Sequence, residues 1–286
     1  MLSTSRTLAR LVKLEHTIFA LPFAYAGMVL GARAADADVT VMLVVWITLA
    51  MVGARTLAMG LNRVIDARID AANPRTADRE IPSGLVSRAQ VWVLCAASLA
   101  VLVAATTQLD PITRVLWPIP VAMFLLYPYT KRFTWLCHIL LGLSIGLAPL
   151  AAWLAAGGAG TELTPYLVWI GIATWIGGFD VIYATADLEF DRAHDISSIP
   201  ARFGLAPALR IVRALHVATI TCFAGAILMA ELGAVAWAGL TLAAALLAWE
   251  NSMVRADDLT RLDKAFFIVN SWVGVVLGTS LILGTL

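Results

Sequence analysis

Long apolar runs alternate with short polar connections along most of the chain. Several of these runs approach or exceed the roughly 20 residues that an α-helix needs to cross a bilayer. They lack the in–out alternation of membrane β-strands, so each spanning run is expected to be a helix with internally paired backbone groups. The pattern predicts an all-α membrane protein with nine spans, at about residues 16–34, 40–61, 89–108, 112–129, 136–156, 165–186, 207–230, 233–250 and 265–285.

The composition supports a membrane protein and says little about partners. Of the 286 residues, 60% are hydrophobic and 14% are charged, whereas a soluble domain carries about 25% charged residues. The net charge of +1 and the lack of a basic patch argue against a nucleic-acid partner. Cys95, Cys137 and Cys222 lie in separate apolar runs and are interpreted as small buried hydrophobic residues.

The positive charges test the number of spans. With nine spans, most of the 20 Lys and Arg residues fall on one side of the membrane. The positive-inside rule then places the N-terminus and the long polar connections in the cytoplasm, and the C-terminus outside. The basic residues before the first apolar run are interpreted as the lead-in to a retained helix, not as a signal peptide. We expect one domain, residues 1–286.

Two aspartate-rich segments, at about 62–88 and 180–206, lie on the expected cytoplasmic side. In the first, Asn62, Asp66 and Asp70 are spaced four residues apart, which places three oxygen-bearing side chains on one helix face. The second segment repeats this spacing at Asp187 and Asp191, and Asp180 lies two turns deeper on the same face.

Carboxylates spaced four residues apart repel one another, and ionisable residues near a membrane are rare and usually functional. Mg²⁺ is the natural neutralising cation, because it takes oxygen ligands and commonly joins carboxylates to substrate phosphates. Two such clusters on facing helices would clamp a diphosphate between metal ions. The alternative is a solvated helix end neutralised by arginines, for example Asp66 by Arg63.

Basic residues accompany both segments. Arg75 and Arg79 follow the first carboxylates, while Lys131 and Arg132 close another cytoplasmic helix end. Guanidinium and ammonium groups suit phosphate oxygens, so we predict that these four residues, together with Tyr127, bind the diphosphate. Ordinary anchoring of a cytoplasmic helix end is an equal alternative for Lys131 and Arg132.

Arg55 is a charged residue within a predicted membrane span, where an ionisable side chain is energetically costly. It lies in mid-span, on the helix face of Asn62, and a buried arginine needs a partner. Either Asp180 or an acidic group of the acceptor substrate would serve. We predict that Arg55 holds the acceptor, directly or through Asp180.

Other polar residues receive weaker interpretations. Tyr183 and His16 are added to the acceptor-binding group. His138 and His216 are interpreted as residues of helix packing or of the membrane interface.

The chain resembles the UbiA superfamily of intramembrane prenyltransferases, and within it the bacterial 4-hydroxybenzoate polyprenyltransferase-like proteins. The resemblance covers nearly the whole chain. It is most specific in NRVIDARIDAANPRTADREIPSG (62–84), YPYTKRFTWLCHILLGLSIGLAPLAAW (127–153) and GFDVIYATADLEFDRAHDISSIPARFG (178–204). It implies nine helices around a central cavity in a bacterial inner membrane, a Mg²⁺ cofactor and an active site that faces the cytoplasm.

The resemblance also implies roles for individual residues. Lys131, Arg75 and Arg79 match positions that contact the diphosphate, and Lys131 is predicted to be catalytic together with Asp66 and Asp191. The residues that match the metal–diphosphate motif are Asn62, Asp66, Asp70, Asp187 and Asp191.

Two residues depart from the family pattern. Arg63 stands where many members have Asp, a form typical of the subgroup that acts in the futalosine route to menaquinone. Asp195 stands where relatives often have Gly. Because Asp tolerates the left-handed conformation better than most residues, we expect the turn at Asp195 to persist.

The expected reaction is transfer of a polyprenyl group from polyprenyl diphosphate to a hydroxylated aromatic acid in ubiquinone or menaquinone biosynthesis. The acceptor would be 4-hydroxybenzoate or 1,4-dihydroxy-6-naphthoate. Asp180, Asp191 or the released diphosphate would remove the ring proton. Two alternatives are a transporter that uses the carboxylates as ion or proton sites, and a CDP-alcohol phosphotransferase, whose D-G-x-x-A-R element neither cluster contains.

Overall fold

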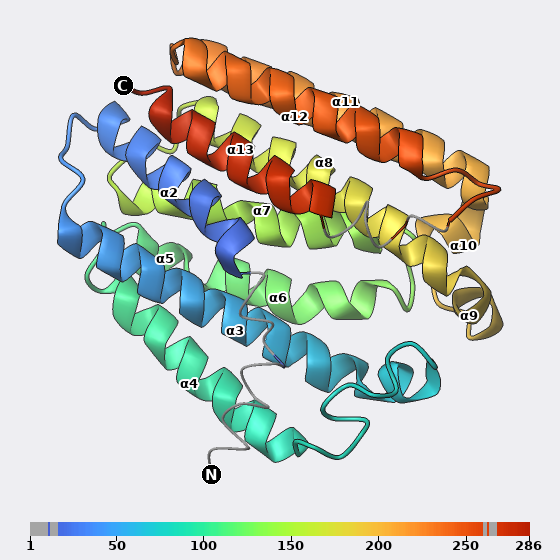
Figure 1. Ribbon diagram of the computed structural model, residues 1–286. Coiled ribbons are helices and arrows are strands. Elements are labelled where there is room, and N and C mark those ends of the chain that lie inside the picture. Colours follow the sequence, from blue (N-terminus) through green and yellow to red (C-terminus); the bar gives the residue numbers. More distant parts are fainter. Residues whose placement is uncertain (1–10, 12–16, 260–261, 263–267) are drawn as a thin grey trace. The chain divides into compact units, whose positions relative to one another are not determined.

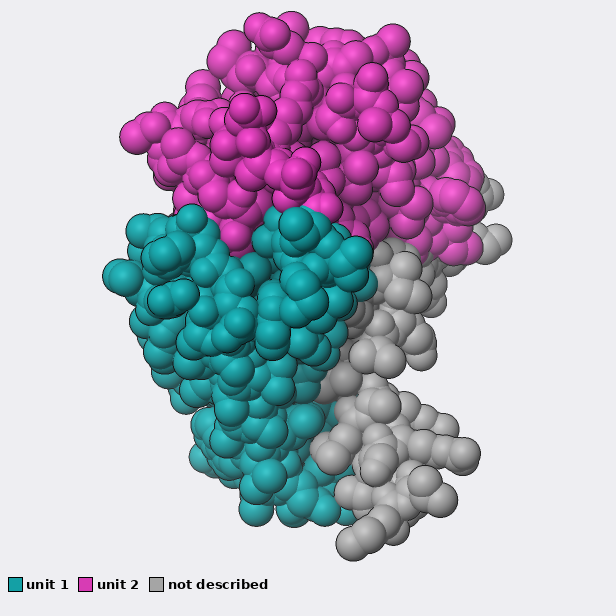
Figure 2. Space-filling view, turned by 90° about the vertical axis from the view of Figure 1, so that its left-hand side faces the viewer, with its two compact units in different colours: residues 1–21, 40–129 teal, residues 22–39, 130–286 magenta. Residues whose placement is uncertain are grey.

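The computed structural model describes residues 11, 17–259, 262 and 268–286 (Figure 1). Within this part of the chain the regular structure is helical, apart from one isolated bridge between Arg255 and Asp258. The chain divides into two compact units, each with its own hydrophobic cluster (Figure 2). Unit 1 comprises Met1–Leu21 and Thr40–Tyr129, and unit 2 comprises Pro22–Val39 and Thr130–Leu286.

Two helices of unit 1 begin at residues whose side chains cap them. The hydroxyl of Thr40 accepts from Leu43 N at 3.1 Å, and Ser87 forms a capping box with Gln90, so each side chain satisfies backbone N–H groups that a helix start leaves unpaired. Pro118 follows Trp117 and separates two short helices within the fourth predicted span. The helices are α3 (Val41–Ala72), α4 (Arg88–Thr106), α5 (Thr113–Leu116) and α6 (Pro118–Thr130), the last ending one residue into unit 2.

Helix α3 is longer than the predicted span 40–61. It runs for 32 residues to Ala72, and its C-cap residue, Asn73, directly precedes Pro74. The residue before a proline disfavours the helical conformation, which accounts for the end point. At 1.5 Å per residue the helix is about 48 Å long, against a hydrocarbon core of about 30 Å. The last three turns therefore lie beyond the length that a span needs, and they carry the first acidic cluster.

Unit 2 is a bundle in which α8 packs between α7 and α11, and α12 packs against α11 and α13 (Figure 1). Its core includes Phe23, whose ring lies 5.7 Å from the Trp175 ring and 6.0 Å from the Phe223 ring. The elements of this unit are α2 (Thr17–Ala34, from Pro22 onward), α7 (Cys137–Ala155), α8 (Thr164–Ala184), the 3₁₀ turn η2 (Thr185–Asp187), α9 (Leu188–Ala193), α10 (Ile199–Phe203), α11 (Leu205–Met229), α12 (Ala234–Met253) and α13 (Asn270–Leu283).

Glycines allow two pairs of helices in unit 2 to approach closely. A Cβ at Gly27 or Gly31 of α2 would collide with the α7 backbone at Pro149 or Trp153. A Cβ at Gly142 of α7 would collide with the backbone of α8. Both contacts involve Gly-xxx-Gly pairs, whose missing side chains let helix backbones touch in a membrane protein.

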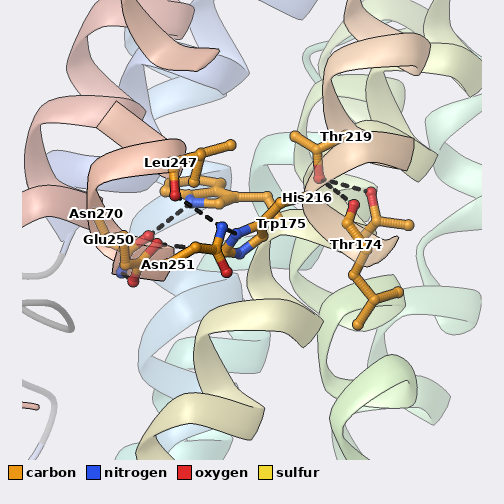
Figure 3. Close-up of polar contacts among 9 residues, drawn as sticks. Thr174, Trp175, His216, Thr219, Leu247, Glu250, Asn251 and Asn270 are labelled. Atoms are coloured by element: carbon orange, nitrogen blue, oxygen red, sulfur yellow. Dashed lines mark hydrogen bonds and ion pairs between the residues drawn. The ribbon is translucent and has the colours of Figure 1, made fainter. Parts of the chain in front are cut away.

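A buried polar network joins α8, α13 and α12. The indole N–H of Trp175 donates to Asn270 Oδ1 at 2.7 Å, and Asn270 Nδ2 donates to Glu250 Oε1 at 2.6 Å (Figure 3). Glu250 is 0% exposed. Because Asn270 satisfies both an indole donor and a carboxylate acceptor, it fixes the position of three helices at once.

The network continues onto α11. Glu250 Oε2 lies 4.0 Å from His216 Nε2, and Asn251 Nδ2 lies 2.8 Å from His216 Nδ1 while also donating to Leu247 O (Figure 3). A Cβ at Gly178 of α8 would meet the His216 ring, so this glycine makes room for the histidine. His216 therefore belongs to the packing between helices, as the sequence suggested.

Six helices in the described part of the chain are long and apolar enough to cross a membrane. They are α3, α4, α7, the stretch Thr164–Ala193, α11 and α12, and α13 is a shorter apolar helix. The protein is thus an all-helical membrane protein. The predicted number of nine spans and the orientation of the chain in the membrane go beyond this observation.

We expect Asn270→Leu to destabilise unit 2. The substitution leaves the Trp175 N–H and Glu250 Oε1 without their partner, at a cost of about 1–3 kcal/mol for each unsatisfied buried group. Thermal unfolding in detergent should shift to lower temperature. Thr279→Val is the matched control, because Thr279 is exposed and bonds only to carbonyls of its own helix. Equal unfolding temperatures for the two variants would contradict the role given to the network.

Candidate functional site

The first acidic cluster lies on the last turns of α3. Asn62 Nδ2 donates to Asp66 Oδ2 at 3.3 Å, one helical turn away. Asp66 is 1% exposed and Asp70 is also buried. A buried carboxylate is costly unless it is paired, hydrogen-bonded or bound to a metal ion. The burial of two of them on one helix face is therefore a feature that stability alone does not favour.

Asp70 has one satisfied and one unsatisfied oxygen. Its Oδ1 accepts from Arg79 Nη1 at 2.7 Å. Its Oδ2 is buried and has no hydrogen-bond partner among the described residues. The structure thus pairs a predicted metal ligand with a predicted diphosphate ligand, and leaves one carboxylate oxygen available to a cation.

The chain after α3 folds back along the helix end. Asn73 Oδ1 accepts from Arg75 N at 2.9 Å, and the Thr76 hydroxyl donates to Asp70 O at 3.0 Å. The first bond is an Asx turn, which lets a short polar side chain replace a backbone partner. These bonds return the chain toward Asp70 and account for the position of Arg79, whereas the Arg75 side chain is exposed.

Two further arginines of α3 are largely withdrawn from solvent. Arg63 is buried, and neither its Nε nor that of Arg55 has a hydrogen-bond partner in the described part of the chain. Asp70 lies near enough to Arg63 for its charge to act on the guanidinium group. Tyr127, whose phenol is neutral near pH 7, lies near both arginines. Arg63 thus contributes positive charge to the first cluster. Arg55 and Asp180 belong to different units, and their pairing stays a prediction.

The second acidic cluster lies where α8 passes into α9. The 3₁₀ turn Thr185–Asp187 interrupts the helix between them (Figure 1). A 3₁₀ stretch inside a helix often marks a functional position. Asp187 is half-buried at this turn, whereas Asp191 in α9 is only 7% exposed.

Asp191 is held by the segment that follows it. The Ser198 hydroxyl donates to Asp191 Oδ2 at 2.8 Å and also caps α10 by accepting from Ala201 N. Between them, Asp195 adopts a left-handed conformation with φ of 53°. The predicted turn at this non-glycine position is confirmed, and it brings Ser198 back to the carboxylate.

Lys131 lies in the same unit and is tied to this segment. Ser197 N donates to Lys131 O at 2.7 Å, and Cys137 Sγ donates to Ser197 O at 3.3 Å. The Lys131 ammonium acts electrostatically on Asp191. The structure therefore brings the predicted residues Lys131 and Asp191 together, while the side chain of Arg132 is exposed.

One partnership in unit 2 was not predicted from the sequence. His138, at the start of α7, lies with its Nδ1 2.6 Å from Asp180 Oδ2 in α8. His138 is buried, and its Nε2 has no partner among the described residues. The histidine had been interpreted as a packing or interfacial residue. Its 42-residue separation from Asp180 left no periodic signal in the sequence.

The remaining predicted acceptor residues are less defined. Tyr183 is partly buried in α8, one turn beyond Asp180. His16 lies outside the described residues.

The donor set of the acidic clusters fits Mg²⁺. Among the described residues, no group of three or more His, Cys, Asp or Glu side chains could hold a metal ion. Magnesium does not require such a cage, because it usually keeps several waters and takes one or two carboxylates together with substrate phosphates. The unpartnered Oδ2 of Asp70, beside the buried Asp66, supplies oxygen ligands of this kind.

The helices and buried carboxylates define an integral membrane protein equipped to bind a divalent cation with an anionic ligand. The chain belongs to the UbiA prenyltransferase family, whose model matches residues 20–272. The prediction of a prenyltransferase is thereby confirmed, and family membership excludes a transporter or a CDP-alcohol phosphotransferase as its class.

Relatives in sequence and structure agree with this family. The chain is 29% identical over 280 residues to a 4-hydroxybenzoate octaprenyltransferase of Vibrio atlanticus, covering 97% of this chain and 93% of the relative. It is 34% identical to a UbiA homolog from Aeropyrum pernix K1, with a TM-score of 0.85, covering 95% and 98%. A UbiA homolog from Archaeoglobus fulgidus bound to DMAPP and Mg²⁺ shares the fold, with a TM-score of 0.72, 18% identity and coverage of 97% and 99%.

The Asp70–Arg79 pair can be tested by a double-mutant cycle. We expect Arg79→Gln alone to destabilise the protein, because it leaves a buried carboxylate without its charged partner. Asp70→Asn should relieve that cost, so the two changes should be non-additive by about 1–3 kcal/mol in unfolding measurements. Additive effects would mean that the pair does not stabilise this turn.

Proposed function

We propose that the protein transfers a polyprenyl group from polyprenyl diphosphate to a hydroxylated aromatic acid in quinone biosynthesis. The observation that carries the proposal is the burial of Asp66, Asp70 and Asp191 at the ends of long membrane helices. A buried carboxylate suits a site that binds a cation and an anionic substrate, and Asp70 Oδ2 has no hydrogen-bond partner among the described residues. The match to a protein named 4-hydroxybenzoate octaprenyltransferase supports an aromatic acceptor.

The whole chain, residues 1–286, would act as one prenyltransferase domain. We propose nine spans, with a cytoplasmic N-terminus, an external C-terminus and an active site that faces the cytoplasm of a bacterial cell. The distribution of Lys and Arg supports this orientation. The positions of α2, α6 and α13 at three of the predicted spans are compatible with it.

The residues that would hold Mg²⁺ are the oxygen-bearing side chains of both acidic segments. When bound, the ion would supply positive charge that stabilises the leaving diphosphate. We propose that both clusters serve the same diphosphate. The predicted metal ligands are Asn62, Asp66, Asp70, Asp187 and Asp191.

Basic side chains would complete the binding of the donor. The Lys131 ammonium interacts electrostatically with Asp191 in this structure. When the donor binds, the same ammonium would contact the phosphate oxygens. Arg79 would neutralise Asp70 and contact the diphosphate through the other arms of its guanidinium group. Further contacts to the diphosphate would come from Arg75, Arg132 and Tyr127.

The reaction begins with cleavage of the bond between the allylic carbon and the diphosphate oxygen. The apolar helices would exclude water from the resulting allylic cation, which would otherwise be hydrolysed. An electron-rich ring carbon of the acceptor attacks the cation. Arg55, Tyr183 and His16 would orient the acceptor, with Arg55 binding its carboxylate.

We expect Asp66→Ala and Asp191→Ala each to abolish turnover while the protein still folds in the membrane. Each removes a carboxylate that the proposed clamp requires. Asp257→Ala is the matched control, because Asp257 is exposed in the connection after α12. Product is followed with radiolabelled prenyl diphosphate, added Mg²⁺, and either 4-hydroxybenzoate or 1,4-dihydroxy-6-naphthoate. Near-normal product from either cluster variant would rule out a shared diphosphate site.

Arg55→Gln should raise the KM for the acceptor, because it removes the guanidinium that we assign to the acceptor's carboxylate. The loss of a charge-assisted hydrogen bond of about 1.5–3 kcal/mol corresponds to an increase of roughly 10–100-fold. The KM for prenyl diphosphate should change little. Steady-state kinetics in membranes measure both constants, and unchanged acceptor kinetics would remove Arg55 from the site.

A further inference from the structure

We propose that His138 is a positioning residue that orients the carboxylate of Asp180 to accept the proton lost by the aromatic ring. The inference rests on the proposed function, because it requires an aromatic acceptor. It assigns a base to the last step of the reaction. It also gives a role to the buried His138, which hydrogen-bonds to Asp180 and acts on Asp191 through its charge alone.

The geometry of the pair supports this assignment. His138 Nδ1 and Asp180 Oδ2 are 2.6 Å apart, at the short end of hydrogen-bond distances. An ionised carboxylate can only accept, so the imidazole Nδ1–H is the donor. The bond joins the first turn of α7 to α8 and fixes the direction of the carboxylate.

The two oxygens of Asp180 are thereby made different. Among the described residues, the recorded hydrogen bond to this carboxylate comes from His138 and is accepted by Oδ2. The Asp180 side chain is 25% exposed, whereas that of His138 is 6% exposed. Oδ1 is therefore the oxygen that can contact a ligand. Oδ2 stays hydrogen-bonded, because its partner His138 is shielded from water. A carboxylate held in one orientation loses less entropy when it takes part in a reaction.

The position of Asp180 also suits the proton transfer. It precedes Asp187 by seven residues on the helix, which is about 10 Å along the axis at 1.5 Å per residue. The carbon that is attacked lies next to the diphosphate, and the acceptor ring lies beyond that carbon. A base removed by this distance from the diphosphate ligands fits the ring better than Asp191, which we assign to the metal ion.

The allylic C–O bond breaks and its electron pair leaves with the diphosphate, while ring π electrons form the new C–C bond. The ring C–H bond then breaks, and its electron pair restores the aromatic system. The proton moves to Asp180 Oδ1, while Oδ2 keeps the hydrogen bond from His138 Nδ1.

The test uses an acceptor that carries deuterium at the reacting ring carbons. In the native enzyme, we expect loss of the ring proton to be fast, with an isotope effect on kcat near one. His138→Leu removes the positioning bond, so kcat should fall by roughly 10–100-fold, part of the 10²–10⁴-fold that a general base contributes. The isotope effect should then rise clearly above one, because proton loss becomes rate-limiting.

Two variants of the pair extend the test. His138→Asn places an amide N–H near the position of Nδ1–H and should restore most of kcat with an isotope effect near one. Asp180→Asn should lose turnover even though it still binds prenyl diphosphate with Mg²⁺. His138→Leu with a normal rate, or with a lower rate and an unchanged isotope effect, would overturn the proposal.

His216→Gln is the matched control for damage to the fold. This second buried histidine of unit 2 bonds to Asn251 and lies in the packing network (Figure 3). Its substitution should lower thermal stability without a rise in the isotope effect, and a rise equal to that of His138→Leu would also overturn the proposal. Absence of any prenyl transfer by the native enzyme would instead refute the proposed function, and this outcome is separate from all the others.

Discussion

The constraint on which this protein depends is the burial of carboxylates at the ends of membrane helices. Asp66, Asp70 and Asp191 would each be more stable in water, and a carboxylate without a partner is expensive in an apolar setting. The chain meets this constraint with local partners, namely an amide from Asn62, a guanidinium from Arg79 and a hydroxyl from Ser198. Among the described residues, Asp70 keeps its Oδ2 without a hydrogen-bond partner, and an oxygen of this kind is available to a cation.

Two of these partners, Arg79 and Ser198, are supplied by the segments that follow the acidic clusters. After α3, Pro74 ends the helix and Thr76 bonds back to Asp70. After α9, the left-handed residue Asp195 returns the chain so that Ser198 meets Asp191. In both units, a turn that directly follows the carboxylates brings back the group that stabilises them. The polar connections are therefore part of the site and not only links between helices.

The sequence was informative where the signal is local. The apolar runs located most helices, and the tolerance of Asp195 for a left-handed conformation was predicted from its residue type. The predicted span ended at residue 61 with the apolar run, whereas the helix continues to Ala72, as the helical spacing of Asn62, Asp66 and Asp70 indicated. A helix that continues into water keeps the same 3.6-residue period, and hydropathy does not mark its end.

The contacts that the sequence missed join distant segments. His138 and Asp180 are 42 residues apart, and Trp175 and Asn270 are 95 residues apart. Each of these side chains, taken alone in an apolar run, fits ordinary packing. The pairing depends on which helix faces lie together, and that is decided by the tertiary fold. Arg79 was placed correctly near the first cluster, but its direct bond to Asp70 required the loop between them to be known.

The 3₁₀ turn at Thr185–Asp187 changes the azimuth of every side chain that follows it. Such a turn advances about 120° per residue, against about 100° in an α-helix, so three residues accumulate an offset of about 60°. A helical wheel drawn through Asp180 therefore misplaces Asp191 by about a sixth of a revolution. Asp180 and Asp191, which the sequence spacing places in one row, therefore point in different directions about the helix axis.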